Sequence, residues 1–324
     1  MRALAAFLPA LALLASVPAA ADPSIEPLSW LQRAAASARQ GNYAGTIMHV
    51  QGERTSTSRM THLVVAGIEH ERIESIDGPR REVIRKGDQL QCFYPDAKTV
   101  RIDRRVTARF FPSHFAGPVE AIVEGYELRM GGIERVADRD CQWIHLDPRD
   151  ALRYAQQLCA ELGTGLLLKA KTLGAKGQVL EQYAFTELRL GIDVSKRDLR
   201  STFQSQSRGW RRDEQPAATP APGTSGWAVS ALPPGYRLVG EMQRTMPNRP
   251  APVTQLVVAD GFASMSIFVE PMAERPRPGE ATSEEGSLSV FARPVGEYMV
   301  TVLGEVPPAA AQQVGRSVGR PAAR

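Results

Sequence analysis

The sequence predicts an α+β protein with two domains: a large, open, curved antiparallel β-sheet (a half-barrel) over helices, and a small α+β domain. Two observations support this. From Tyr43 apolar and polar residues alternate in short runs bounded by Gly, Ser or Asp, which is typical of strands joined by tight turns. A polar segment rich in Pro, Ala and Gly then interrupts the chain, which has 324 residues. We therefore predict a large domain over 22–205, a linker over 206–227 and a small domain over 228–320.

The first 21 residues have the features of a secretory signal peptide. Met1-Arg2 is a short basic start, Ala3 to Val17 is an apolar run, and Ala19-Ala20-Ala21 is a small-residue cleavage site before Asp22. The apolar run is shorter than the roughly 20 residues that a membrane-spanning helix needs. We therefore expect an exported protein located in the periplasm.

The large domain is expected to begin with a helix over Pro27–Gln40, with Ser29 as the N-cap. Strands follow, and Gly87-Asp88 is a hairpin turn. An apolar insert over 107–125 contains a short helical stretch, Val119–Glu124. Because a sheet of about ten strands curls, the first helix and the insert are expected to cover its concave face.

In the small domain we expect five strands and a final helix. The helix covers Ala309–Val318, after Pro307. The segment 272–286 is rich in Pro, Glu and Gly, and we expect a mobile loop there.

The charge is only weakly informative about partners. The formal net charge is +4, and cleavage of the signal removes Arg2 and leaves about +3. A small positive charge favours acidic partners such as phosphorylated lipid head groups or an acidic peptide, and solubility explains it equally well. Nucleic acid is not expected as a partner because the protein is exported.

No catalytic motif is present in the sequence. It contains no G-x-S-x-G, H-E-x-x-H or C-x-x-C pattern. We therefore predict that the protein is not an enzyme, and that it uses no metal and no cofactor.

The cysteine count is odd, so at least one thiol stays free or pairs between chains. The three residues are Cys92, Cys141 and Cys159. If a hairpin is centred near Asp150, Cys141 and Cys159 directly face each other across two strands, close enough for a disulfide. Two reduced, buried thiols are the alternative.

Two residue groups are candidate binding sites. The first is aromatic and lies in the apolar insert, where it either contacts lipid or forms a hydrophobic plug: Phe110, Phe111 and Phe115. The second is basic and follows the turn Asp77-Gly78-Pro79, where it either contacts an anion or partner or forms a solvated strand face: Arg80, Arg81, Arg85 and Lys86.

Several stretches, in the same order along the chain, resemble the MucB/RseB family, which are periplasmic negative regulators of an envelope-stress (sigma-E type) sigma factor. They are NYAGTIMHV, IESIDGPRREVIRKGD, RVADRDCQWIHLDPRDALRY, GTGLLLKAKTL, LEQYAFTEL, LPPGY, VVADGFASMSIFVE and VTVLGEVPP. The resemblance implies a large domain similar to lipoprotein carriers. It also implies binding to the periplasmic domain of a membrane anti-sigma factor, which is thereby protected from regulated proteolysis until lipid, lipopolysaccharide or lipoprotein releases it.

Within this interpretation, the small domain binds the partner as an extended peptide, by strand addition at a sheet edge. An acylated ligand in the apolar concavity of the large domain would then lower the affinity for the peptide. The alternative is a periplasmic lipoprotein or lipid carrier without a regulatory partner, which would not need the second domain. Unpaired strand edges also permit a homo-oligomer.

Overall fold

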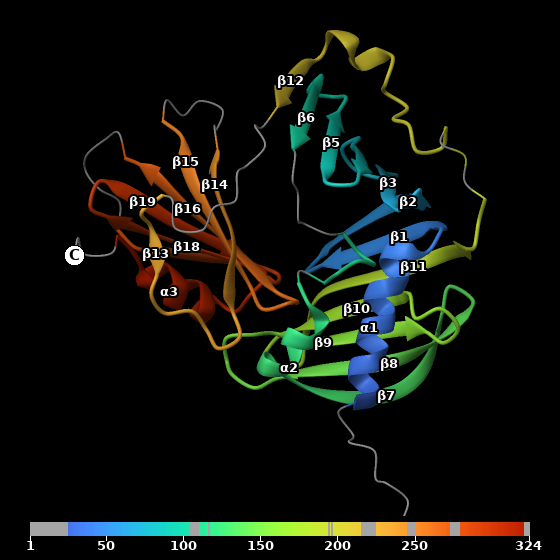
Figure 1. The fold of residues 1–324 in the computed structure, drawn as a ribbon, viewed down its shortest axis with the longest axis horizontal. Helices are drawn as coiled ribbons and strands as arrows, with labels where there is room; N and C mark the ends of the chain where they lie inside the picture. The colour runs from blue at the N-terminus through green and yellow to red at the C-terminus, as the bar shows by residue number, and fades with distance from the viewer. Residues whose placement is uncertain are drawn as a thin grey trace, which may run out of the picture.

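The computed structural model describes most of the chain and shows two main β-sheets, a two-stranded sheet and helices (Figure 1). The predicted signal peptide, 1–21, lies outside the described residues. The described ranges are 25–103, 110–115, 117–193, 195, 197–214, 225–244, 251–272 and 279–320.

The large sheet has twelve strands in the order β12-β6-β5-β4-β3-β2-β1-β11-β10-β9-β8-β7, and β12 and β7 form its two separate edges. Every neighbouring pair is antiparallel except β12 and β6, which are parallel. The predicted α+β class and the open curved sheet are confirmed (Figure 1). The strands are β1 (Tyr43–Gln51), β2 (Arg54–Val65), β3 (Ile68–Ser75), β4 (Glu82–Lys86), β5 (Gln89–Tyr94), β6 (Thr99–Asp103), β7 (Tyr126–Val136), β8 (Arg139–Pro148), β9 (Ala155–Glu161), β10 (Leu167–Leu173), β11 (Val179–Leu190) and β12 (Arg211–Glu214).

Helix α1 (Ile25–Gln40) crosses one face of this sheet (Figure 1). Leu31, Ala34 and Ala38 form its buried stripe and join the main core of the domain. The helix begins before the predicted N-cap, and the Ser29 hydroxyl instead donates to the Glu26 carbonyl within the first turn (2.8 Å). The predicted second helix is a 3₁₀ turn, η1 (Val119–Ala121), followed by α2 (Ile122–Gly125).

The small sheet has six strands in the order β14-β15-β16-β19-β18-β17. Helix α3 (Pro308–Ser317) packs on it, and β13 (Ala228–Val229) pairs with β20 (Val318–Gly319). The strands are β14 (Arg237–Arg244), β15 (Val253–Ala259), β16 (Ser264–Pro271), β17 (Ala281–Glu285), β18 (Leu288–Val295) and β19 (Tyr298–Gly304). The sixth strand, β17, falls inside the predicted loop 272–286, so that expectation is wrong for 281–285; residues 273–278 lie outside the described part.

A connector, which we define as residues 197–214, leaves the end of the large sheet and returns to its edge. It contains the 3₁₀ turn η2 (Gln206–Gly209) and ends as β12, which pairs with β6. Buried Glu82 of β4 fixes its path by accepting hydrogen bonds from the Thr202 amide (3.0 Å) and hydroxyl (3.1 Å). The large sheet therefore extends to Glu214, into the segment predicted as linker.

Candidate functional site: the junction between the two sheets

Arg153, in the loop between β8 and β9, joins the two domains. Its side chain is fully buried, and its Nε donates to Asp260 Oδ2 in the small domain (2.8 Å). Its other guanidinium nitrogens donate to the Asp150 carboxylate and the Pro234 carbonyl. The guanidinium thus donates hydrogen bonds to groups from both domains. A buried charge needs such partners to offset its loss of hydration.

Two tyrosine rings flank this guanidinium. Its central carbon lies 5.9 Å from the Tyr126 ring centre and 4.9 Å from that of Tyr236. Burial raises the pKa of both tyrosines, so both stay neutral. A Cβ on Gly125 would lie 2.4 Å from the Arg153 Nε, so only glycine lets the arginine pass at this point.

A second polar contact between the domains centres on Glu181 of β11. Its buried carboxylate accepts hydrogen bonds from the Tyr183 hydroxyl (2.9 Å) and from the Ser287 hydroxyl of the small domain (2.8 Å). His49 Nε2 lies 2.7 Å from the same carboxylate. Burial raises the pKa of Glu181, but the hydrogen bonds from His49, Ser287 and Tyr183 outweigh it and hold the pKa below its usual value.

Two more titratable groups lie at this contact. Glu305 is itself exposed but lies between buried Gly304 and Val306 of the small domain. Desolvation of its carboxyl group and the charge of Glu181 raise its pKa to about 7. The His114 ring packs edge-on against Phe262 of the small domain (5.7 Å) and against Tyr183 (5.3 Å). Burial lowers the pKa of His114 to about 4, so its ring is neutral at pH 7.

The predicted lipid contacts lie beside this junction. Phe111 and Phe115 are buried in the main core at 4% and 2% exposure. Phe111 stacks on Tyr183 (5.6 Å), and Phe115 packs edge-on against Phe262 of the small domain (6.2 Å). Phe110 is half-buried and packs on the neighbouring cluster of Val83, Leu90 and Cys92. In this state the three rings fill space in the large domain.

The structure does not bring the predicted basic residues together on one surface. Arg85 is fully buried with Glu71, its Nε lying 2.7 Å from the carboxylate. Arg80 forms an exposed pair with Asp96 (2.8 Å). The remaining two are exposed: Arg81 and Lys86. A ligand could reach Arg85 only by breaking a buried ion pair, which is costly.

Cys141 and Cys159 are disulfide-bonded in the structure, with 5.3 Å between their Cα atoms. The predicted register is wrong by two residues, because Cys141 lies opposite Glu161 and Cys159 lies opposite Trp143. The bond therefore joins diagonal rather than directly facing positions. Cys92 is a buried free thiol whose pKa is raised by burial.

Sequence reasoning did not identify Arg153, Asp260 or Glu181. All three lie in stretches quoted above for the resemblance, namely LDPRDALRY, VVADGF and LEQYAF. The available signal was weak: each charged residue directly follows an apolar one, namely Leu152, Ala259 or Leu180. The sequence could not show which charge pairs with which, because Arg153 and Asp260 are 107 residues apart.

The comparisons with known proteins agree along the whole of both domains. The sequence matches the family models MucB/RseB N-terminal domain over residues 26–203 and MucB/RseB C-terminal domain over residues 221–319. It is 34% identical over 312 residues to "Sigma factor AlgU regulatory protein MucB" of Pseudomonas aeruginosa, which covers 94% of both chains. It is 23% identical over 307 residues to "Sigma-E factor regulatory protein RseB" of Escherichia coli (strain K12), again covering 94% of each.

Two solved structures share the fold. "The complex structure of Pseudomonas aeruginosa MucA/MucB" matches with a TM-score of 0.73 and 30% identity, covering 92% of this chain and 100% of that chain. "Crystal structure of MucB in complex with MucA(peri)" matches with a TM-score of 0.71 and 31% identity, covering 91% and 99%.

The fold and the junction define a two-domain α+β protein in which an open sheet is joined to a smaller sheet by buried polar contacts. Within the described ranges, no group of three or more His, Cys, Asp and Glu side chains could hold a metal ion, and no helix is long and apolar enough to cross a membrane. The chain belongs to the MucB/RseB family, and is homologous to sigma factor regulatory proteins.

Proposed function

We propose that this protein acts in the periplasm, where it binds the periplasmic region of a membrane anti-sigma factor and protects it from regulated proteolysis. The observation that carries the proposal is the match, over more than nine-tenths of the chain, to MucB structures solved with MucA. The protein acts by binding, and no catalytic step is needed for this role.

The free edge of the small sheet is the proposed contact for the partner peptide. β17, at one edge, lies against the large domain, where the Tyr154 hydroxyl donates to Glu284 (3.2 Å). β14, at the other edge, pairs only with β15 among the described strands. Its two ends contact the large domain through side chains alone, Arg237 with Glu124 (2.8 Å) and Arg244 with Asp103 (3.6 Å). Val239 of β14 sits at a register irregularity and is 50% exposed. An unpaired edge with an exposed apolar side chain suits strand addition by an extended peptide.

A lipid signal reaches this edge through the junction. An acyl chain entering beside Phe110 would compete with Phe111 and Phe115 for the apolar space of the large domain. Phe115 contacts Phe262 of the small domain directly, and Phe111 contacts Tyr183, which donates to Glu181. Displacement of these rings would therefore weaken the contacts between domains, and the bound peptide and lipid would each lower the affinity for the other.

Binding of the mature protein to the cognate anti-sigma fragment, measured by biolayer interferometry, tests the function. We expect saturable binding, and its absence with folded protein would contradict the proposal. Val239→Lys tests the edge and should weaken binding at least about tenfold by placing a charge in the paired strand. Val179→Lys is the matched control, since Val179 is 48% exposed on a strand of the large sheet. Equal effects of both variants would reject the edge and leave the function standing.

Release by lipid is measured by titrating the complex with lipopolysaccharide or an acylated peptide. We expect dissociation of the fragment, with a weaker response in Phe110→Ala. Phe203→Ala is the control, because Phe203 is also half-buried but packs on the cluster of Phe93, Val100 and Ile102. A flat titration would contradict the lipid signal.

A further inference from the structure

The connector borders a half-open pocket on the large sheet, on the face opposite to Cys92 and Phe110, and the arginines of its lining are exposed. Phe93 of β5 points into it, and alternation along the strand places Cys92 on the other face. The pocket has a volume of about 390 Å³, within the range of small-molecule sites. It is lined by residues of β5, the connector and β12: Gln91, Phe93, Arg200, Ser201, Thr202, Gln204, Ser205, Ser207, Arg208 and Arg212.

Three arginines line this pocket and no carboxylate does. Arg200, Arg208 and Arg212 make no ion pair or hydrogen bond through their side chains with any residue that the structure describes. Arginines on other strands of the large sheet differ: Arg72 of β3 pairs with Glu82 (2.7 Å), and Arg101 of β6 pairs with Asp103 (3.1 Å). No described carboxylate therefore pairs with the positive charge of the pocket.

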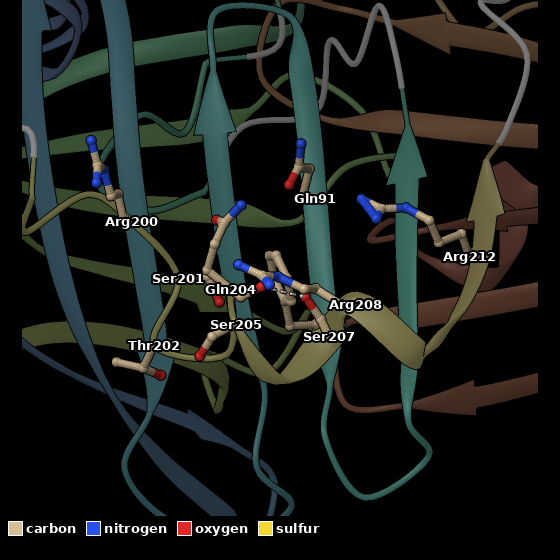
Figure 2. A pocket seen from close by; sticks show the side chains of 10 residues that line it. Gln91, Arg200, Ser201, Thr202, Gln204, Ser205, Ser207, Arg208 and Arg212 are labelled. Carbon is tan, nitrogen blue, oxygen red and sulfur yellow. Dashed lines mark hydrogen bonds between the residues drawn. The ribbon is translucent and has the colours of Figure 1, made fainter.

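Neutral donors complete the lining. Figure 2 shows Gln204 and Arg208 lying between Arg200 on one side and Arg212 on the other, with Gln91 beside them. The Ser205 hydroxyl and the side-chain amide of Gln204 have no protein partner among the described residues. A guanidinium group can donate two parallel hydrogen bonds to two oxygens of one phosphate, and hydroxyl and amide groups can donate to the remaining oxygens.

The backbone of the pocket is held in place without these arginines. Glu82, fully buried, receives the Arg72 guanidinium and the Thr202 amide and hydroxyl. Phe203 packs on the sheet beside Trp210 (ring centres 5.9 Å apart). The arginines are therefore not needed to position the connector, and they remain available for a ligand.

We propose that this pocket binds a phosphate-bearing polar ligand, with Arg208 and Arg212 contacting the phosphate and Arg200 extending the site. Like charges grouped around one cavity repel each other, and a bound dianion relieves that repulsion. The phosphate could belong to a soluble molecule or to a lipid head group, and the two sources share the same recognition chemistry. The site is separate from the strand edge and the junction, so it does not depend on the proposed function.

The test is isothermal titration calorimetry of the mature protein with inorganic phosphate and with pyrophosphate, at low and high salt. Flotation with vesicles containing phosphatidic acid, compared with phosphatidylcholine alone, identifies a lipid source. Arg208→Gln and Arg212→Gln should weaken binding at least about tenfold, as expected for loss of charge-assisted hydrogen bonds.

Arg211→Gln is the matched control. Arg211 is exposed on the same strand, adjacent to Arg212, and does not line the pocket. The Arg211→Gln substitution removes the same charge as Arg212→Gln, but from outside the pocket. It should therefore change the affinity for the phosphate ligand less than about twofold if the pocket is specific. The proposal is supported if phosphate, pyrophosphate or phosphatidic acid binds the wild type and Arg211→Gln but not Arg212→Gln. Equal losses in both variants, or no saturable binding of phosphate, pyrophosphate or phosphatidic acid, would overturn it.

Discussion

Replacing Arg153 with methionine tests whether the buried ion pair holds the two domains together. The substitution keeps an unbranched apolar stem, shorter than that of arginine, and removes the charge. It leaves the Asp260 carboxylate, 2% exposed, without its cation. Loss of one partner of a buried pair costs about 3–5 kcal/mol. Asp260 keeps hydrogen bonds from the Phe262 and Ala263 amides (3.0 and 2.8 Å), so we expect a loss of about 3 kcal/mol, the lower end of that range.

The assay is urea unfolding followed by tryptophan fluorescence, with Arg129→Met as the control. Arg129 pairs with Asp147 at 2.6 Å, but the two side chains are 56% and 42% exposed, so solvent screens the pair and its removal should cost far less stability than removal of Arg153. Adding Asp260→Asn to Arg153→Met should restore part of the stability, because both charges are then absent. Losses within about 1 kcal/mol of each other for Arg153→Met and Arg129→Met would refute the reasoning.

Three further predictions concern the pH response, the disulfide and a crowded glycine. Between pH 4.5 and 6.5 the lowered pKa of His114 makes stability rise with pH, whereas the raised pKa of Glu305 makes stability fall. Thermal-shift scans of Glu305→Gln should therefore show a steeper rise of the melting temperature with pH than scans of the wild type. An unchanged profile would contradict this. A non-reducing peptide map of the exported protein should recover Cys141 and Cys159 in one linked pair, and free thiols at both would reject the bond. Gly45→Ala should lower the melting temperature, since its Cβ would lie 2.3 Å from a backbone carbonyl across the strand pair; a melting temperature equal to wild type would argue against it.

Local patterns predicted most of the fold because hairpins are local. Alternation located β1 to β5, and Gly87, with φ near 58°, forms the turn expected between β4 and β5. Strands without alternation were missed. β17 is exposed at every position, and β12 is four polar residues that pair with a strand more than a hundred residues earlier. Neither has an apolar face for a pattern to reveal.

The candidate site was harder to predict because its residues meet only after both domains have folded. LDPRDALRY was interpreted locally as a hairpin turn, and LPPGY and VVADGF were quoted only for the resemblance. Each of the three stretches contributes one contact to the Arg153 guanidinium. Hairpin register also depends on loop shape, which explains why the cysteine positions were predicted two residues out of register.

The aromatic residues at the junction link the two proposed binding events, that of a lipid in the large domain and that of a peptide on the small domain. Phe262 of the small domain packs against the core of the large domain, and Leu152 of the large domain packs against the core of the small domain. Between these apolar contacts lie the Arg153 and Glu181 contacts, whose groups would be hydrated if the domains separated. Hydration of these groups offsets part of the free energy needed to separate the domains. That free energy is therefore lower than for an apolar interface of equal area. A ligand that displaces Phe115 removes one apolar contact directly, so modest differential binding in the large domain is enough to change how the small domain presents its edge strand.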